Sequence, residues 1–321
     1  MIPRRILLAA AALPLARPAF AQGWPTRPVT LMVPFAAGGA SDILARVLAQ
    51  RLSLLVGQGV VVDNRGGAGG TMATEAVARG AADGHTLLWA HMGTLAIAPH
   101  LYPRLGYDPL RDLAPVSLVA RLPMVLVVNR SLGVNTLAEF IALARARPEG
   151  IEYGTAGQGS NTHLGAVAFE EAAGIRLLPV HYRGSGPVMT DVVAGTVKAT
   201  LTGIPAALPL IRDRQVVALG VSSLARSAAL PDVPTIAEGG VPGFDVTQWH
   251  GIAAPGRTPA ALLESQNAAI VATLGTPDMR DRLAAEGAAP EPTTIPAFRA
   301  LIAAEQERWG ALIRRAGVRL E

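Results

Sequence analysis

Apolar and polar positions repeat along the chain as strand, glycine turn and helix. The first unit has an apolar run at 29–35, a turn at 34–42 and an amphipathic stretch at 43–56. Strands that alternate with helices predict an α/β fold, in which ligands collect at the carboxyl ends of the strands. Further apolar runs in the first half lie at 60–63, 86–90, 116–119 and 124–128, with a helix expected at 71–79.

The pattern begins again near residue 124, which indicates a second domain. A capping box, Thr136-x-x-Glu139, starts a helix that is expected to run to Arg145. Strands follow at 151–154, 177–180, 199–202 and 216–222, and a helix at 164–173 stops at Gly174. The segment 244–254 then returns to the first domain, so two crossings form a hinge. We expect lobe 1 at residues 22–123 and 250–321 and lobe 2 at residues 124–249.

Two turns, one in each half, are candidate ligand sites. The turn at 34–42 has two glycines before Ser41 and Asp42, and the turn at 155–163 is rich in glycine, hydroxyl and amide groups. Each directs free amide donors and the positive end of a helix at one point, which suits an anion. No Gly-Lys-Ser/Thr and no Gly-x-Gly-x-x-Gly occurs there, so a carboxylate fits better than a phosphate or a dinucleotide.

A purely structural role for these turns stays open. Ser160 and Thr162 are suited to capping a helix, and Asp42 at a helix start stabilises that helix by about 0.5–1 kcal/mol without touching a ligand. The glycines Gly67-x-Gly69 resemble half of a dinucleotide fingerprint, but a tight structural turn is the favoured interpretation.

Residues 1–21 have the pattern of an export signal. Arg4 and Arg5 form a basic start, an apolar stretch follows, and 19–21 is an A-x-A cleavage site. The stretch is too short to span a membrane, and the general secretory route is favoured over twin-arginine export. Removal of the signal lowers the formal net charge from 28 − 24 = +4 to 25 − 24 = +1. With Lys198 as the only lysine and no basic run, nucleic acid is excluded as a partner.

The residue types argue against catalysis and metal binding. The chain has no cysteine, no Gly-x-Ser-x-Gly and no His-Glu-x-x-His. Its six histidines are scattered, although His91, His163 and His181 follow strand ends and can converge. We therefore predict no catalytic residue, no metal site and no cofactor.

The chain resembles the periplasmic solute-binding receptors of tripartite tricarboxylate transporters, the Bug family, over essentially the whole mature length. The motifs that carry the resemblance are Trp24-Pro25-x-Arg27-Pro28, Val33-Pro34-Phe35-x-x-Gly38-Gly39-x-x-Asp42, Val62-x-Asn64-Arg65-x-Gly67-Ala68-Gly69-Gly70, Asp83-Gly84-x-Thr86-Leu87-Leu88, Tyr107-Asp108-Pro109, Gly157-x-Gly159-Ser160-x-Thr162-His163-Leu164 and Leu230-Pro231-Asp232-Val233-Pro234-Thr235.

The resemblance implies a two-lobed type II periplasmic binding protein that closes on a carboxylated solute. It also implies a monomeric periplasmic receptor that delivers the solute to membrane subunits of the transporter. The loops matching 35–42 and 156–163 are expected to grip the carboxylate. The expected ligand contacts are Phe35, Ala36, Gly38, Gly39, Ser41, Asp42, Gly93 and Thr94 in lobe 1, and Ala156, Gly157, Ser160, Asn161, Thr162 and Arg183 in lobe 2.

One departure from the family pattern bears on the ligand. Family members commonly have Asp-Asn before the proline of a later ligand-facing loop, whereas this chain has Thr202-Gly203-Ile204-Pro205. A plain or aromatic carboxylate is therefore expected rather than an amino-bearing one. His250 stands where the family often has an aromatic residue, and it is either a polar ligand contact or a surface histidine. Two other functions stay open: a receptor that signals through a membrane sensor, and a periplasmic enzyme.

Overall fold

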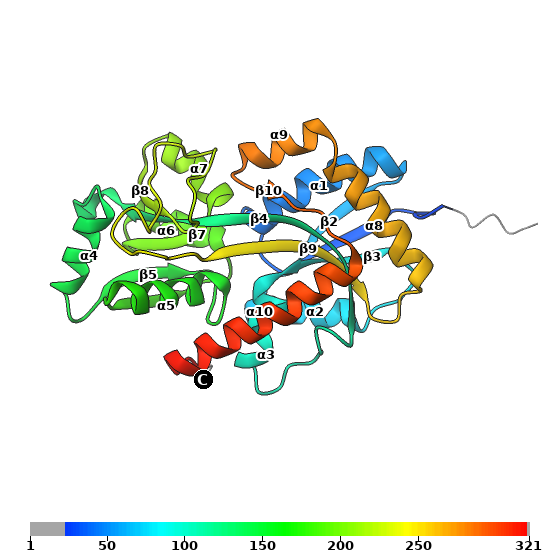
Figure 1. Cartoon of the computed structure of the whole chain (residues 1–321), viewed down its shortest axis with the longest axis horizontal. Helices are drawn as coiled ribbons and strands as arrows, with labels where there is room; N and C mark the ends of the chain where they lie inside the picture. The colour runs from blue at the N-terminus through cyan, green and yellow to red at the C-terminus, as the bar shows by residue number, and fades with distance from the viewer. Residues whose placement is uncertain (1–22, 320–321) are drawn as a thin grey trace, which may run out of the picture.

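The computed structural model describes residues 23–319, and the export signal predicted for residues 1–21 lies outside them. The chain forms two α/β lobes joined by long strands, of which β4 (Leu113–Asn129) and β9 (Thr247–Pro255) run between the lobes in Figure 1. None of the helices in the described residues is long and apolar enough to cross a membrane.

The sheet of lobe 1 has the strand order β2-β1-β3-β9-β4. Its first three strands pair in parallel, whereas β9 is antiparallel to both β3 and β4. They are β1 (Val29–Val33), β2 (Val60–Asn64) and β3 (Thr86–His91), with the short β10 (Ala289–Pro290) on β4. The helices of this lobe are α1 (Ala40–Val56), α2 (Thr71–Ala78), α3 (Ala98–Leu101), α8 (Ala260–Leu274), α9 (Pro277–Ala285) and α10 (Ile295–Ala316).

The sheet of lobe 2 continues from β4 in the order β4-β7-β5-β6, with β8 also paired to β4. Its strands are β5 (Ile151–Thr155), β6 (Leu177–His181), β7 (Ala199–Gly203) and β8 (Val216–Val221). Its helices are α4 (Leu137–Arg145), α5 (Asn161–Ala173), α6 (Ser185–Ala194) and α7 (Ile204–Arg212). The strands predicted from the apolar runs of this half are confirmed to within one residue at each end.

One prediction about the strands is wrong. The runs at 116–119 and 124–128 belong to one strand, β4, which continues through Pro123. Proline does not break the strand there because β4 changes partners at that point: Pro123 pairs with Thr247 of β9, and Met124 pairs with Gly203 of β7. For the description below we take residues 23–123 and 247–319 as lobe 1 and residues 124–246 as lobe 2.

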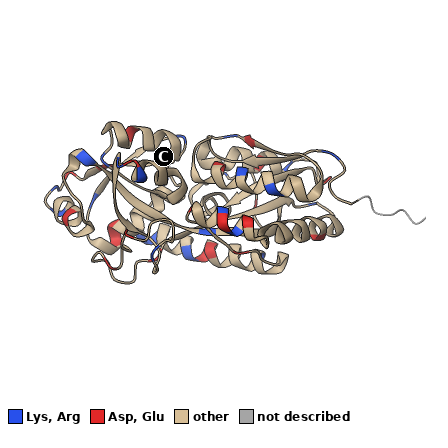
Figure 2. Ribbon diagram, turned by 90° about the horizontal axis from the view of Figure 1, so that it is seen from above, with Lys and Arg blue, Asp and Glu red and all other residues tan. Residues whose placement is uncertain are grey.

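Apolar side chains from both lobes share one core. A single cluster of buried residues joins Leu118 in lobe 1, Met124 at the crossing and Phe169 in lobe 2. One charged residue, Glu305, is buried beside this core, where it accepts hydrogen bonds from Trp249 and Trp309. Figure 2 shows acidic and basic residues interspersed along both lobes. The fold is therefore held by burial of apolar surface along the crossing strands, with most charges distributed over the exterior.

Candidate functional site

The two predicted turns face each other between the lobes. Residues of both turns line the same space, and a Cβ placed on Gly39, in the first turn, would lie 3.7 Å from the Cβ of Ser185, at the start of α6 in lobe 2. This small space, here called the deep cavity, is one in which the centre of a water molecule can reach ≈ 20 Å³. It is lined by Phe35, Ala36, Gly39, Ala40, Ser41, His91, Ala156, Asn161, Thr162, Ser185, Gly203 and Gln248.

Four helices begin at the deep cavity. Its lining includes the N-cap of α1 (Gly39), the first residues of α5 (Asn161) and α6 (Ser185), and the N-cap of α7 (Gly203). No side chain caps α1, α6 or α7, so the first amides of these helices are not taken by capping side chains, although Pro187 in α6 and Pro205 in α7 have no N–H to offer. The positive ends of four helix dipoles therefore meet at one place, which favours an anion. The sequence predicted two of these helix starts.

Asp42 shapes the first turn. The Gly38 N–H donates to Asp42 Oδ2 at 2.9 Å, and Arg46 Nε forms an ion pair with Asp42 Oδ1 at 2.8 Å. Burial raises the pKa of Asp42, but the contacts with Arg46 and Gly38 outweigh burial and lower it overall. Neither Gly38 nor Asp42 lines the deep cavity, so the structural role weighed for Asp42 agrees with its contacts.

The second turn is fixed by its own hydroxyl groups. Thr162 Oγ1 accepts a hydrogen bond from the Ala156 N–H at 2.7 Å and lies 2.9 Å from Ser160 Oγ. Ser160 Oγ also accepts from the His163 N–H, and so caps α5. Ala156, Asn161 and Thr162 line the deep cavity, whereas Ser160 supports them from behind.

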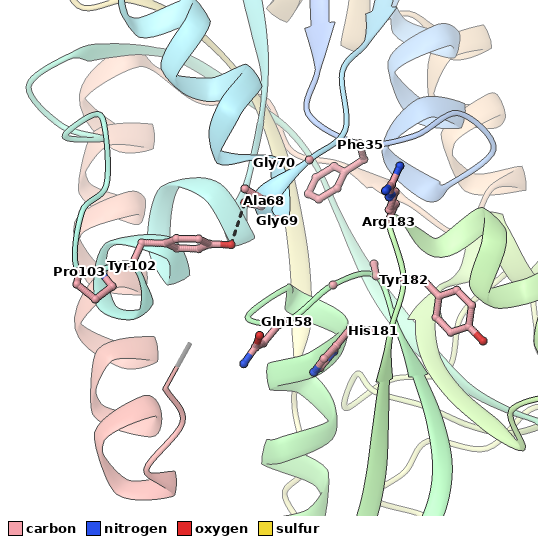
Figure 3. A pocket seen from close by; sticks show the side chains of 13 residues that line it. Phe35, Ala68, Gly69, Gly70, Tyr102, Pro103, Gln158, His181, Tyr182 and Arg183 are labelled. Carbon is pink, nitrogen blue, oxygen red and sulfur yellow. Dashed lines mark hydrogen bonds between the residues drawn. The ribbon is translucent and has the colours of Figure 1, made fainter. Parts of the chain in front are cut away.

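A larger space, here called the outer pocket, adjoins the deep cavity, and a water centre can reach ≈ 500 Å³ within it. Phe35 and Ala156 line both spaces. Figure 3 shows Phe35 and Tyr102 on the lobe 1 side and Gln158 and His181 on the lobe 2 side. The lining consists of Phe35, Gly67, Ala68, Gly69, Gly70, Tyr102, Pro103, Ala156, Gly157, Gln158, His181, Tyr182 and Arg183.

The glycine turn at 67–70 forms one wall of the outer pocket. Gly70 has φ 92°, and a Cβ there would lie 2.9 Å from Pro34 O, so the predicted tight turn is confirmed. The same turn also faces lobe 2, which the sequence did not indicate. The Tyr102 hydroxyl donates to Ala68 O at 2.8 Å and holds the turn in place. Arg183, also in the lining, is exposed and has no ion-pair partner among the described residues.

Two buried histidines lie side by side near the deep cavity, and of the two only His91 lines it. The rings of His91 and His250 are 4.9 Å apart, and both side chains are at most 1% exposed. The alternative that His250 is a surface histidine is therefore wrong. Burial lowers the pKa of His91 to about 4 and that of His250 well below its usual value, so both rings are neutral at pH 7.

Hydrogen bonds fix the tautomer of each ring. The Gly93 N–H donates to His91 Nδ1 at 2.9 Å, and Trp89 Nε1 donates to His250 Nδ1 at 3.0 Å. In a neutral imidazole one nitrogen accepts and the other carries the proton, so both rings carry it on Nε2. Both therefore present N–H donors on that side.

The strand-end residues Gly93 and Thr94 do not line either space. Thr94 is fully buried, and its Oγ1 donates to His91 O at 3.1 Å. His91, which directly follows the predicted third strand, lines the deep cavity where Gly93 and Thr94 were expected to do so. Position at a strand's carboxyl end was the signal that could have found it.

The histidines form two pairs rather than the cluster of three that the sequence allowed. His91 pairs with His250, and His163 pairs with His181 at 4.9 Å between ring centroids. Within residues 23–319 no group of three or more His, Asp or Glu residues is arranged to hold a metal ion. None of the residues that line the deep cavity or the outer pocket is acidic.

Comparison with known proteins finds relatives in one family of receptors. Residues 44–318 match the model of the tripartite tricarboxylate transporter family receptor. Protein BugT of Bordetella pertussis is 39% identical over 308 residues, which are 96% of this chain and 94% of BugT. Rpa4515 of R. palustris, solved with adipate, is 38% identical with a TM-score of 0.90, over 92% of this chain and 100% of its own.

The periplasmic binding protein BugD has a TM-score of 0.86 at 35% identity, over 92% of this chain and 100% of its own. These likenesses confirm the predicted fold, a two-lobed α/β periplasmic binding protein of type II with a hinge between the lobes.

Proposed function

The chain belongs to the family of tripartite tricarboxylate transporter receptors, and on this premise we propose that it captures a small carboxylated solute between its lobes. We further propose that it does so in the periplasm and delivers the solute to the membrane subunits of a transporter of this type. The family consists of solute-binding receptors rather than enzymes.

The observation that carries the proposal is the meeting of four helix N-termini at the deep cavity. Their free amides, together with neutral His91, supply donors for an anion without a fixed positive charge. The absence of acidic side chains from the lining leaves an ammonium group without a partner. The proposed solute is therefore a plain or aromatic carboxylate rather than an amino acid.

The two spaces suggest how such a solute would lie. Its carboxylate would sit in the deep cavity, and the rest of the molecule would extend past Phe35 into the outer pocket, toward Tyr102. A volume of ≈ 500 Å³ lies in the range of small-molecule sites. Adipate, the acid present with the relative Rpa4515, is a solute of this kind.

Binding and closure would be linked through the hinge. The deep cavity has room for about one water molecule, which is less than a carboxylate needs. A solute would therefore enter while the lobes are apart, and the lobes would close around its carboxylate less tightly than they lie in the described structure. A solute that contacts both lobes binds the closed form more tightly than the open form, and so shifts the population toward closure.

A thermal-shift screen tests the solute class. Adipate, malate, tricarboxylates, aromatic acids and amino acids are added separately to the purified protein. An acid present at about a hundredfold its dissociation constant stabilises the folded state by about 2.7 kcal/mol. Stabilisation by an acid without an amino group is expected, and tight calorimetric binding of an amino acid instead would contradict the proposed solute class.

Delivery is tested separately in cells. Deletion of the gene should abolish uptake of the radiolabelled acid that the screen identifies, and plasmid-borne wild-type protein should restore it. Normal uptake in the deletion strain would contradict the transport role while leaving the binding result intact.

A further inference from the structure

Gln248 occupies an unusual position for a buried amide. It lies on the crossing strand β9, opposite Leu122 of β4, and is 2% exposed. Its Oε1 accepts a hydrogen bond from Asn161 Nδ2 of lobe 2 at 2.7 Å. Its Nε2 has no hydrogen-bond partner among the described residues, although it is buried at the lining of the deep cavity. The Gln248 side chain also lies close to His91, where it raises the pKa of the imidazole against the larger, lowering effect of burial. Buried donors are nearly always paired, so the unpaired Nε2 requires an explanation.

The surroundings of Nε2 show which kind of group it would meet. A Cβ placed on Gly203, the N-cap of α7, would lie 2.6 Å from Gln248 Nε2 and 2.7 Å from the Cβ of Ala40 in α1. The unpaired amide thus lies where α1 and α7 begin, packed against Gly203, whose lack of a side chain leaves room for it. The amides of both helix starts and the Gln248 amide are all donors.

We propose that Gln248 binds a carboxylate oxygen of the solute through its side-chain N–H and thereby selects for acids. This inference rests on the proposed function and adds to it a named specificity residue on the hinge. A carboxylate only accepts hydrogen bonds and can satisfy Gln248 and the two helix starts together, whereas an ammonium only donates and cannot. A neutral hydroxyl can accept as well, but its hydrogen bonds are weaker than those to a charged oxygen.

The position of Gln248 gives the contact a second consequence. Its Oε1 is held by Asn161 of lobe 2, and its backbone belongs to the hinge strand. A carboxylate bound to Nε2 therefore contacts the hinge strand directly and lobe 2 only indirectly, through the hydrogen bond between Gln248 and Asn161. This hydrogen bond joins the two lobes, so a solute that fixes the Gln248 side chain in this position favours the closed form.

The test uses calorimetry on full-length purified protein with adipate, malate and the acid that stabilises the wild type most in the thermal-shift screen. Gln248→Met keeps the length of the side chain and removes the amide. Because hydrogen bonds to a charged group are strong, affinity should fall by about tenfold to a hundredfold. Gln266→Met is the matched control, since Gln266 is a buried glutamine on α8 that lines neither space. This control should stay within about threefold of the wild type.

The same Gln248→Met substitution in an Asn161→Ala protein distinguishes direct contact of Gln248 with the solute from an effect that Gln248 exerts through Asn161. If Gln248 served only as the acceptor for Asn161, then Gln248→Met would cause no further loss in an Asn161→Ala protein. The proposal expects a further loss of about tenfold in that background. Melting temperatures of all variants without solute report whether they are folded.

The outcomes separate this inference from the function on which it rests. If the wild type binds none of the acids, the proposed function itself is overturned. If the wild type binds an acid, and Gln248→Met binds it within about threefold in either background, the function stands and the role of Gln248 is wrong.

Discussion

Gly203 lies between Gln248 of the hinge strand β9 and Ala40 of α1, and the space there is too small for a side chain on Gly203. Its φ of −60° is accessible to any residue, so a substitution there acts by bulk and not by backbone strain. Gly203 and Ala40 belong to different lobes, and the methyl group of Gly203→Ala would lie between them only when the lobes are closed.

We predict that Gly203→Ala weakens solute binding and leaves stability nearly unchanged. Overpacking costs about 1–3 kcal/mol, equivalent to a loss of about five- to 150-fold in affinity, but opening of the lobes relieves it in the free protein. Calorimetry measures the affinity and urea unfolding measures the stability. A variant with wild-type affinity would show that the lobes do not close at this point.

The buried histidines lead to a prediction about pH. Burial lowers the pKa of His91 and His163 to about 4 and that of His250 well below its usual value, with His181 adding to the effect on His163. An unfolded histidine titrates near about pH 6.5, so below that pH the unfolded chain takes up protons that the folded protein does not. Stability should therefore be fully present above about pH 6.5 and fall as the pH drops toward 4.

The variant His250→Gln should reduce this dependence. Each such histidine contributes up to about 1.4 kcal/mol per pH unit, and the variant loses one of them. Urea unfolding between about pH 5 and 7 measures the slope. An equal slope for His250→Gln would mean that His250 is not held neutral by burial.

Residue types explain which single positions were predictable. Gly39, Ser41, Asn161 and Thr162 lie in local motifs, where glycine and capping chemistry signal a helix start within a few residues. Gln248 carries no such signal, because a glutamine in a strand is ordinarily a solvated residue. Its importance comes from Asn161 and Gly203, which are distant in sequence and reach it only in the folded molecule.

At the scale of elements, α4 shows how local chemistry fixes a boundary. The capping box predicted for Thr136 and Glu139 is confirmed: the Glu139 N–H donates to Thr136 Oγ1, and the Thr136 N–H donates to Glu139 Oε2. The start of α4 was therefore predictable. The start of α6 was not assigned to the site because its N-cap, Gly184, has no side chain to mark an anion site. The start of α7, whose N-cap is Gly203, was placed in a ligand-facing loop by the family resemblance alone.

We predict that Thr136→Ala lowers the free energy of unfolding by about 0.5–2 kcal/mol, because it removes the acceptor for the first turn of α4. Thr136 lies on an exposed part of lobe 2 and lines neither space, so solute affinity should be unchanged. Chemical unfolding and calorimetry on the same sample measure both quantities. A loss of affinity without a loss of stability would contradict this assignment.

At the scale of the whole molecule, the repeated pattern predicted two lobes and a hinge but not how the lobes meet. The wall of the outer pocket at residues 67–70 depends on contacts between segments that are distant in the sequence. So does the contact of α10 in lobe 1 with α5 in lobe 2. Arg315 of α10 pairs with Glu171 of α5 at 3.1 Å across the lobes, as the course of α10 in Figure 1 allows. Both side chains are about half exposed, so this pair contributes little, and closure must depend on the buried contacts around the deep cavity.

The last prediction tests closure directly with a cross-lobe disulfide. The Cβ positions of Gly39 and Ser185 are 3.7 Å apart, within the range of about 3.5–4.5 Å found in disulfides. The chain has no cysteine of its own, so Gly39→Cys with Ser185→Cys creates a single possible bridge. Gly39 has φ −86°, which a cysteine adopts without strain.

Oxidation of this double variant in the absence of solute should slow solute association by about a hundredfold or more, because the closed form leaves no path into the deep cavity. Reduction should restore the binding rate of the double variant, and each single variant, which cannot form the bridge, should bind equally under oxidising and reducing conditions. Oxidation after saturation should instead trap the solute against dialysis. Rapid binding by fully oxidised protein would mean that the solute enters without separation of the two turns, and the coupling of closure to binding through the hinge would have to be abandoned.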